Sequence, residues 1–344
     1  MANGYTFAGG RLDSVAVTVG APVELTTAGS FDSTYADAAI RLWSTDTVTA
    51  TFNTVTANAL AAVDVVTGEI MFAHLEFYSS GNTSVNSNNF VVFNNSSGQP
   101  WLALRTNTAN NSYGLYYNSN TGASPTWTQI GASQTLVTAT RYAFDIKLTL
   151  GSPHTAEFSV NGSLVISGTF TQASLTALRA MVLTGIQTSG IGVSAHFSQL
   201  LCTIGISTIN AKVKTSRATA AGTNAAWTGA FTDVNEAINL DTTINTSATA
   251  AQKQSYAMGD VTVPSGYVIG TVFQWLRAKN DGAAPNNILS LLRSGGVNYT
   301  SANLTGLGTS FVPVGMRYDT DPNTAAAWTQ TNWNAAEAGY ESAT

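Results

Sequence analysis

The residues best suited to do chemistry are aromatic side chains that stand among asparagines in polar stretches of the chain. Aromatic rings can stack on the apolar face of a sugar, and neighbouring amides can bond its hydroxyl groups. The same residue types also populate protein interfaces and the cores of β-sandwiches, so core packing, a protein interface and a glycan site all stay open. The candidate residues are Trp101, Tyr113, Tyr116, Tyr117, Trp127, Asn110 and Asn118.

The histidines and the cysteine offer less. His74, His154 and His196 are widely separated and have no cysteine or histidine neighbour at the spacing of a metal site. The single cysteine, Cys202, lies in an apolar run, where it is expected to be a buried hydrophobic residue. We therefore expect no intrachain disulfide and no catalytic or metal-binding role for these side chains.

Paired carboxylates of the kind that cleave glycosidic bonds, about 5 to 10 Å apart, are not evident. Glu69 and Glu76 are separated by an odd number of positions, so their side chains face opposite sides of an unbroken strand. Asp145 and Glu157 are expected to be single charges on solvated sheet faces. The chain also contains no G-x-S-x-G, P-loop or G-x-G-x-x-G motif. The sequence therefore predicts a protein that is not an enzyme, without catalytic residues.

An acidic, oxygen-rich stretch runs from Asp319 to Asn323. It could offer Asp319 and Asp321 to calcium, but it lacks the full spacing of an EF-hand loop. The alternative is that both residues cap the turn before Pro322. We expect no cofactor, and the metal question stays open.

The composition excludes several classes of protein. Charged residues make up 10% of the 344 residues, the formal net charge is -5, and no basic patch is present, so nucleic acid is not an expected partner. The beginning of the chain, MANGYTFAGGRLDS, has neither a basic nor an apolar signal region, so no signal peptide is expected. No apolar run is long enough to span a membrane.

Residues 141–170 carry the clearest β pattern. Apolar residues alternate with polar or small ones from Tyr142 to Leu150, which puts the two sets on opposite faces of a sheet. Asn161-Gly162 then stands between two further β-rich runs, as in a tight hairpin. The segment is predicted to be an antiparallel meander with one packed face.

Short strands separated by polar turns continue through most of the chain, which predicts an all-β fold. The sequence predicts a strand over residues 68–78, a long strand over residues 267–277 and one short helix over residues 331–338. A change of composition near residue 208 marks a domain boundary. We expect two β-sandwich, jelly-roll-like domains in tandem, over residues 1–207 and 208–344.

The pattern in residues 141–170, a buried strand, a strand ending in Val-Asn-Gly and a short apolar strand, resembles the late hairpin of laminin-G-like and concanavalin-like lectin sandwiches. The resemblance covers about 30 residues and implies a lectin-like fold for the first domain.

The second domain resembles a domain common in structural proteins of tailed bacteriophages. The resemblance rests on the order YVIGTVFQWLRAKND, ILSLLRSGGVNY and DTDPNTAAAWTQTNWNAAEAGYE. It implies a non-enzymatic virion protein, made in the host cytoplasm and carried on the particle surface as an appendage, fibre, collar or capsid decoration. The implied partners are other virion proteins and copies of the chain.

Two alternatives accompany this expectation. The first domain could be an adhesin that recognises host surface glycans through the aromatic residues. A glycan depolymerase is a more distant alternative, because the paired-carboxylate motif is missing.

Overall fold

The computed structural model describes residues 4–26, 29–43, 46–56, 59–81, 88–107, 112–121, 124–186, 193–236, 241–282, 284–304 and 307–344. Its contacts divide the chain into two compact units. The first unit comprises Met1–Thr54 and Ala62–Val213, and the second comprises Val55–Ala61 and Lys214–Thr344. The expected boundary at residue 208 lies between β19 (Ser194–Ile204) and β20 (Ala218–Ala225).

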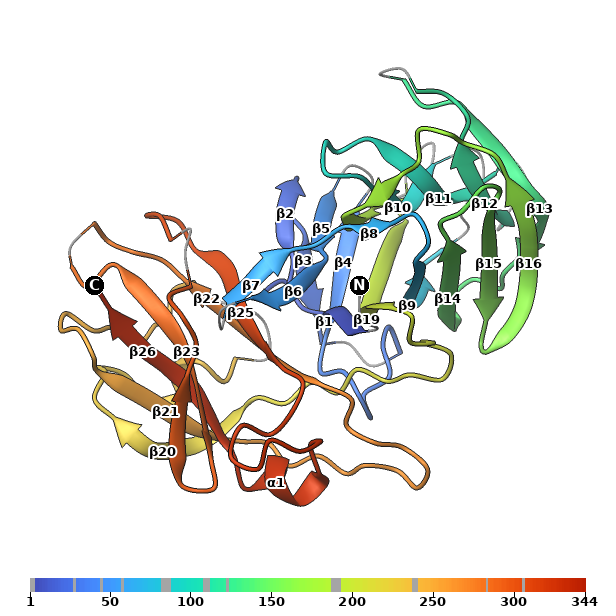
Figure 1. Cartoon of the computed structure of the whole chain (residues 1–344). Coiled ribbons are helices and arrows are strands. Elements are labelled where there is room, and N and C mark those ends of the chain that lie inside the picture. The colour runs from blue at the N-terminus through green and yellow to red at the C-terminus, as the bar shows by residue number, and fades with distance from the viewer. Residues whose placement is uncertain are drawn as a thin grey trace. The chain divides into compact units, whose positions relative to one another are not determined.

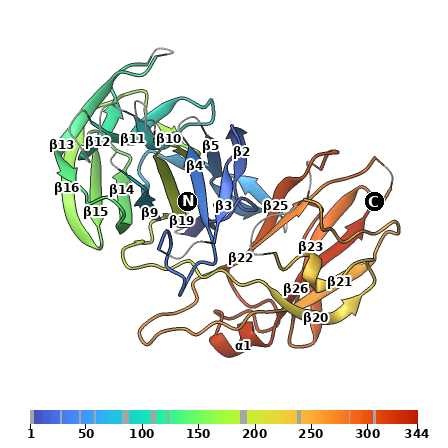
Figure 2. The same ribbon diagram turned by 180° about the vertical axis from the view of Figure 1, so that it is seen from behind.

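The first unit is a sandwich of two antiparallel sheets, as the alternating pattern predicts (Figures 1 and 2). The eight-stranded sheet runs in the order β16 (Ser163–Phe170), β15 (His154–Val160), β14 (Arg141–Thr149), β9 (Ile70–Ser79), β19, β4 (Ala39–Trp43) and β3 (Val23–Leu25), with β1 (Gly4–Gly9) also pairing with β19. The seven-stranded sheet runs in the order β13 (Trp127–Thr135), β12 (Ser112–Asn118), β11 (Pro100–Thr106), β10 (Asn89–Asn94), β18 (Ala180–Thr184), β5 (Thr47–Thr51) and β2 (Ala16–Val19). A small ladder pairs β8 (Val65–Val66) with β17 (Ala177–Leu178).

The core of this unit lies between the two sheets. Alternate residues of β9 point inward, and Phe77 meets Phe90 and Phe144 at ring-centroid distances of 5.1 Å each. These residues come from β9, β10 and β14, so rings from both sheets interlock in one cluster. The predicted hairpin at Asn161-Gly162 joins β15 to β16, and both turn residues have positive φ, 50° and 79°.

The second unit is also built from strands. A five-stranded sheet has the order β20, β21 (Lys253–Met258), β26 (Glu337–Ala343), β23 (Asn287–Ser294) and β24 (Val297–Thr300), and a two-stranded sheet pairs β22 (Val272–Ala278) with β25 (Val312–Tyr318). Two helical turns, η1 (Phe231–Asp233) and α1 (Gln330–Asn334), complete it. The all-β, two-sandwich fold class predicted from the sequence is confirmed.

A segment distant in sequence also joins the second unit. The strands β6 (Asn53–Thr56) and β7 (Ala59–Ala62) pair with one another, and residues 55–61 group with the second unit. Val55 packs against the apolar cluster that includes Leu292, Trp328 and Trp333. The pattern of β-branched residues predicts a strand here, but it does not indicate which unit the strand belongs to.

Two predicted elements are shorter than expected. The helix predicted over 331–338 ends as α1 at Asn334, because residues from Glu337 onward pair with both β21 and β23. The long strand predicted over 267–277 begins only at Val272, where β25 provides a partner. Val268, which precedes this pairing, is 86% exposed.

Candidate functional site

The candidate aromatic residues all lie on strands. Trp101 belongs to β11, Tyr113, Tyr116 and Tyr117 to β12, and Trp127 to β13. These are neighbouring strands at one end of the seven-stranded sheet, as Figure 1 shows. Side chains on a strand alternate between its two faces, so adjacent residues such as Tyr116 and Tyr117 point in opposite directions.

The register defines which residues share the outer face of this sheet. Val92, Ala103, Tyr116 and Gln129 stand opposite one another across β10, β11, β12 and β13. Directly opposed residues lie on the same face, and so do residues two positions away along each strand. We name this surface the outer face; its residues are Asn89, Val92, Asn94, Trp101, Ala103, Arg105, Gly114, Tyr116, Asn118, Trp127 and Gln129.

Two candidates point the other way, into the sandwich. The Tyr113 ring packs edge-on against Phe90 and Phe77, at centroid distances of 5.3 and 5.9 Å. The Tyr117 ring stacks on Phe170 at 4.6 Å. Tyr113 is buried and Tyr117 is half-buried, so core packing accounts for both positions.

Trp101 and Asn118 lie on the outer face but are covered. Trp101 is 2% exposed, and among the described residues its Nε1 has no hydrogen-bond partner. The Asn118 side chain donates to the carbonyl oxygen of Pro100 at 2.9 Å and accepts from the amides of Asn120 and Thr126 at 3.0 Å each. Asn118 therefore fixes the turn between β12 and β13. Asn110 lies outside the described residues.

Tyr116 and Trp127 form a half-buried aromatic platform around an arginine that sequence reasoning missed. The Arg105 guanidinium carbon lies 5.1 Å from the centroid of Tyr116 and 5.3 Å from that of Trp127. Burial lowers the pKa of Arg105 from its ordinary value, and the Tyr116 hydroxyl opposes this shift. Arg105 is the only charged residue between Glu76 and Arg141, and that isolation was the signal available in the sequence.

Gly114 leaves room for the Tyr116 ring. A Cβ at this position would come within 2.7 Å of the Tyr116 ring, so the ring occupies the space that a side chain would fill. Around the platform, the Tyr116 hydroxyl donates to Gln129 Oε1 at 3.1 Å, and Gln129 Nε2 donates to Ser133 Oγ at 2.9 Å. Asn107 Nδ2 donates to the same Ser133 oxygen at 2.7 Å. Flat rings bordered by amides and hydroxyls can stack on a sugar and bond its hydroxyl groups.

On the eight-stranded sheet, His74 and Asp145 form a pair that the sequence did not suggest. They stand opposite one another on β9 and β14, with His74 Nδ1 2.9 Å from Asp145 Oδ1. Thr208 Oγ1 donates to the same carboxylate oxygen at 2.9 Å. The expectation that Asp145 is a solvated charge is wrong, because it is 5% exposed. His74 is 1% exposed, so a substrate cannot reach this pair as the structure stands.

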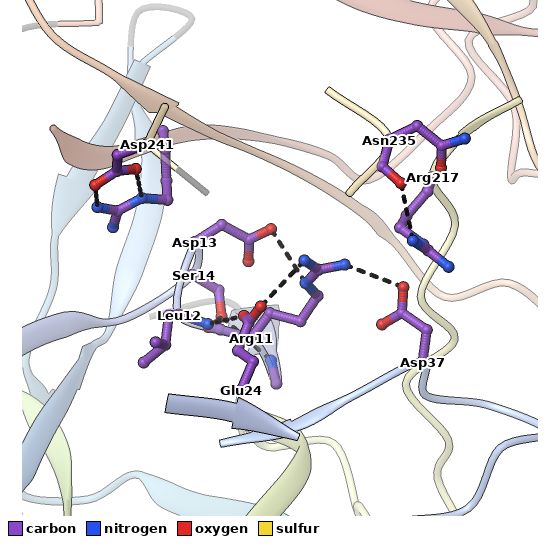
Figure 3. Close-up of polar contacts among 11 residues, drawn as sticks. Arg11, Leu12, Asp13, Ser14, Glu24, Asp37, Arg217, Asn235 and Asp241 are labelled. Atoms are coloured by element: carbon purple, nitrogen blue, oxygen red, sulfur yellow. Dashed lines mark hydrogen bonds and ion pairs between the residues drawn. The ribbon is translucent and has the colours of Figure 1, made fainter. Parts of the chain in front are cut away.

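A second buried cluster surrounds Arg11 (Figure 3). Its guanidinium contacts Glu24 at 3.2 Å, Asp37 at 3.1 Å and Asp13 at 3.7 Å. Burial lowers the pKa of Arg11, but the three carboxylates outweigh burial and raise it above its ordinary value. Leu12 also donates its backbone N–H to Glu24 Oε1 at 2.7 Å, so the cluster holds the turn after β1 in place.

The calcium candidates lie in the second unit. Asp321 is buried and accepts hydrogen bonds from Ser294 Oγ, the Asn323 amide, Thr324 Oγ1 and Asn332 Nδ2, at 2.7 to 3.1 Å. These bonds lower the pKa of Asp321 although burial opposes them. The Asp319 carboxylate instead pairs with Arg317 at 2.9 Å. Among the described residues, no three His, Cys, Asp or Glu side chains group as metal ligands.

Comparisons with known proteins found solved structures that are similar to part of this chain. No family model matches the chain, and no curated protein matches it either. An endo-β-1,4-glucuronan lyase from the fungus Trichoderma reesei is similar in structure, with a TM-score of 0.42, 14% identity, and coverage of 61% of this chain and 97% of the lyase. A carbohydrate esterase from the Shiga toxin-encoding bacteriophage phi24B has a TM-score of 0.39, 10% identity, and coverage of 59% and 100%. An alginate lyase has a TM-score of 0.34, 12% identity, and coverage of 48% and 75%.

These comparisons correct one prediction. The expectation that the protein is not an enzyme is contradicted, because the similar structures include two polysaccharide lyases and a carbohydrate esterase. At these scores and identities the similar structures assign no activity to this chain. No matching family supports the expected virion protein. Among the described residues, no helix is long and apolar enough to cross a membrane.

Proposed function

We propose that this chain is a protein of a tailed-bacteriophage particle and that it binds polysaccharide through the outer face of its seven-stranded sheet. The observation that carries the binding function is the platform of Tyr116, Trp127 and Arg105. The rings are half-buried, and hydrogen bonds join the Tyr116 hydroxyl to Gln129 and Gln129 to Ser133. A rigid platform loses little conformational freedom when a sugar ring stacks on it, which favours binding.

The motifs of the second unit support the place in a phage particle. ILSLLRSGGVNY covers β23 and β24, and the final motif covers α1 and β26. β23, β24 and β26 belong to one five-stranded sheet, whereas YVIGTVFQWLRAKND contains β22 of the two-stranded sheet. The low content of charged residues, 10%, suits a protein that packs against copies of itself or other virion proteins on the particle surface.

Removing the platform should abolish most of the polysaccharide binding. We expect Tyr116→Ala and Trp127→Ala each to weaken binding at least about tenfold, because each removes one stacking surface. Affinity electrophoresis of the full chain in gels that contain dextran, galactomannan or polygalacturonate measures this change. The chain length of each polysaccharide, followed over a day, also tests whether the protein cleaves what it binds.

Trp43→Ala is the matched control for these variants. Trp43 is 40% exposed and also pairs with an arginine, since the Arg41 guanidinium carbon lies 5.0 Å from its ring centroid, but it belongs to the eight-stranded sheet. Its replacement should leave binding unchanged. Equal binding by the native chain and both platform variants would show that the outer face is not the binding site.

The place in the particle is tested separately from binding. Phage particles purified from a lysate of the producing host should contain this chain when their proteins are identified by mass spectrometry, and electron microscopy should locate it on the particle surface. Recovery of the chain only in the particle-free supernatant would contradict the virion role. That result would leave the polysaccharide-binding proposal standing.

A further inference from the structure

The seven-stranded sheet carries an unusual distribution of charge. Arg105 is the only charged residue on its strands, and no aspartate or glutamate stands on any of them. The eight-stranded sheet differs, because its strands carry both positively and negatively charged residues, including Lys147 and Glu157, which form an ion pair at 2.9 Å. One sheet thus presents a single positive charge in an otherwise neutral, aromatic surface.

The position of Arg105 places this charge within the platform. It stands opposite Asn89 on β10 and Gly114 on β12. The rings of Tyr116 and Trp127 lie within cation–π distance of its guanidinium. A stacked guanidinium presents its N–H donors in its own plane, and that fork matches the two oxygens of a carboxylate. A sugar that stacks on either ring would therefore bring a ring carboxylate close to Arg105.

The competing explanation is a purely structural role, in which the cation–π contacts of Arg105 hold the Tyr116 and Trp127 rings in place. The absence of aspartate and glutamate from the strands of this sheet favours a ligand, because a bound carboxylate would supply the negative charge that these strands lack. The buried atoms Trp101 Nε1, Asn89 Oδ1 and Asn94 Oδ1 have no hydrogen-bond partner among the described residues, but they are too covered for a ligand to reach.

We infer that the outer face selects polysaccharides that carry carboxylates, with Arg105 as the specificity-determining residue. This inference rests on the proposed polysaccharide-binding function. Tyr116 and Trp127 supply stacking that does not depend on charge, and Arg105 supplies the discrimination between a uronic acid and a neutral sugar. Opposite charges attract more strongly at a half-buried site than in bulk water, which favours this division of roles.

Polygalacturonate and its methyl ester provide a matched pair of probes, because they differ only in the charge of the carboxyl group. The native chain should bind polygalacturonate about 10- to 100-fold more tightly than the methyl ester in isothermal titration calorimetry, since a hydrogen bond to a charged group contributes that much. Arg105→Gln should remove this preference, so that the variant binds polygalacturonate and its methyl ester with equal affinity. Arg105→Lys should retain part of the preference, because it keeps the charge but loses the planar fork.

Arg141→Gln is the matched control. Arg141 is also a strand arginine, its side chain is 39% exposed, and it belongs to the eight-stranded sheet. It should keep the full preference; a loss equal to that of Arg105→Gln would mean that only overall charge matters and would overturn the inference. Dextran sulfate bound as tightly as polygalacturonate would overturn the assignment to carboxylates.

The outcomes separate this inference from the function on which it rests. If the native chain binds polygalacturonate and its methyl ester equally and Trp127→Ala loses both, the polysaccharide site stands and the inference is wrong. If the native chain binds none of the polysaccharides tested, both fail. If Arg105→Gln does not fold, the native chain still decides, since its preference should fall as salt is raised from 0.05 to 0.5 M only if charge carries it.

Discussion

Phe77→Ala is expected to lower the free energy of unfolding of the first unit by about 3 to 5 kcal/mol. The Phe77 ring is 2% exposed at the centre of the sandwich. It contacts the rings of Phe90, Tyr113, Phe144 and Phe197 at centroid distances of 5.1 to 5.9 Å. Truncation would leave a cavity between the two sheets, because neighbours held by strand pairing cannot all move inward to fill it.

Hydrogen exchange of the full chain, followed by mass spectrometry, resolves this effect within the first unit. The most protected amides of β9, β14 and β19 should lose protection by the predicted free energy, and those of the second unit should not change. Leu164→Ala is the control, since Leu164 is 56% exposed and its removal should cost less than about 0.5 kcal/mol. If Phe77→Ala also lowered the free energy of unfolding by less than about 0.5 kcal/mol, the ring cluster would not be the core of the first unit.

The sheet faces could be predicted because alternation is a local property. Tyr142 to Leu150 alternates strictly, and Phe144, Ile146 and Leu148 are all buried as the pattern predicts. Asn161-Gly162 likewise specifies its turn through its own backbone preferences. Neither inference requires knowledge of which strands become neighbours.

Strand pairing, in contrast, depends on contacts between residues far apart in the sequence. The central strand β9 pairs with β14 and β19, so His74 meets Asp145, 71 positions away. No local pattern indicates that pairing, so the sequence does not predict a contact between the two residues. Irregularities add to the difficulty, because the register shift between Asn89 and Val91 reverses the alternation of faces along β10.

The candidate site was predictable in part for the same reason. The alternation of side chains along a strand is enough to put Tyr116 and Tyr117 on opposite faces of β12. The same alternation puts Trp101 and Arg105 on one face of β11. This alternation cannot show that Trp101 is covered while Tyr116 and Trp127 are half-buried, since burial depends on the segments that pack over the sheet. Arg105 is the only charged residue between Glu76 and Arg141 in the sequence, but no local pattern links it to Tyr116 and Trp127 on the neighbouring strands.

Acidification should destabilise the first unit through His196. This side chain is 6% exposed, its Nε2 lies 2.7 Å from Ser194 Oγ, and its ring stacks on Tyr78 at 5.1 Å. Burial, together with the positive charge of Arg41 directly opposite on β4, lowers the pKa of His196 from 6.5 to about 4. The folded protein therefore binds the proton more weakly than the unfolded chain does.

The sign of the effect follows from this difference. Between about pH 6.5 and pH 4 the unfolded chain takes up a proton that the folded chain does not, so the contribution of neutral His196 is complete above pH 6.5 and is lost as the pH falls toward 4. The loss amounts to about 3 kcal/mol at pH 4. Denaturant unfolding of the native chain and of His196→Gln at pH 7 and pH 4 isolates this contribution, because the carboxylates titrate alike in both proteins. The native chain should lose about 3 kcal/mol more than the variant. Equal losses would mean that His196 accepts its proton in the folded state as readily as in water, which burial beside Arg41 should prevent.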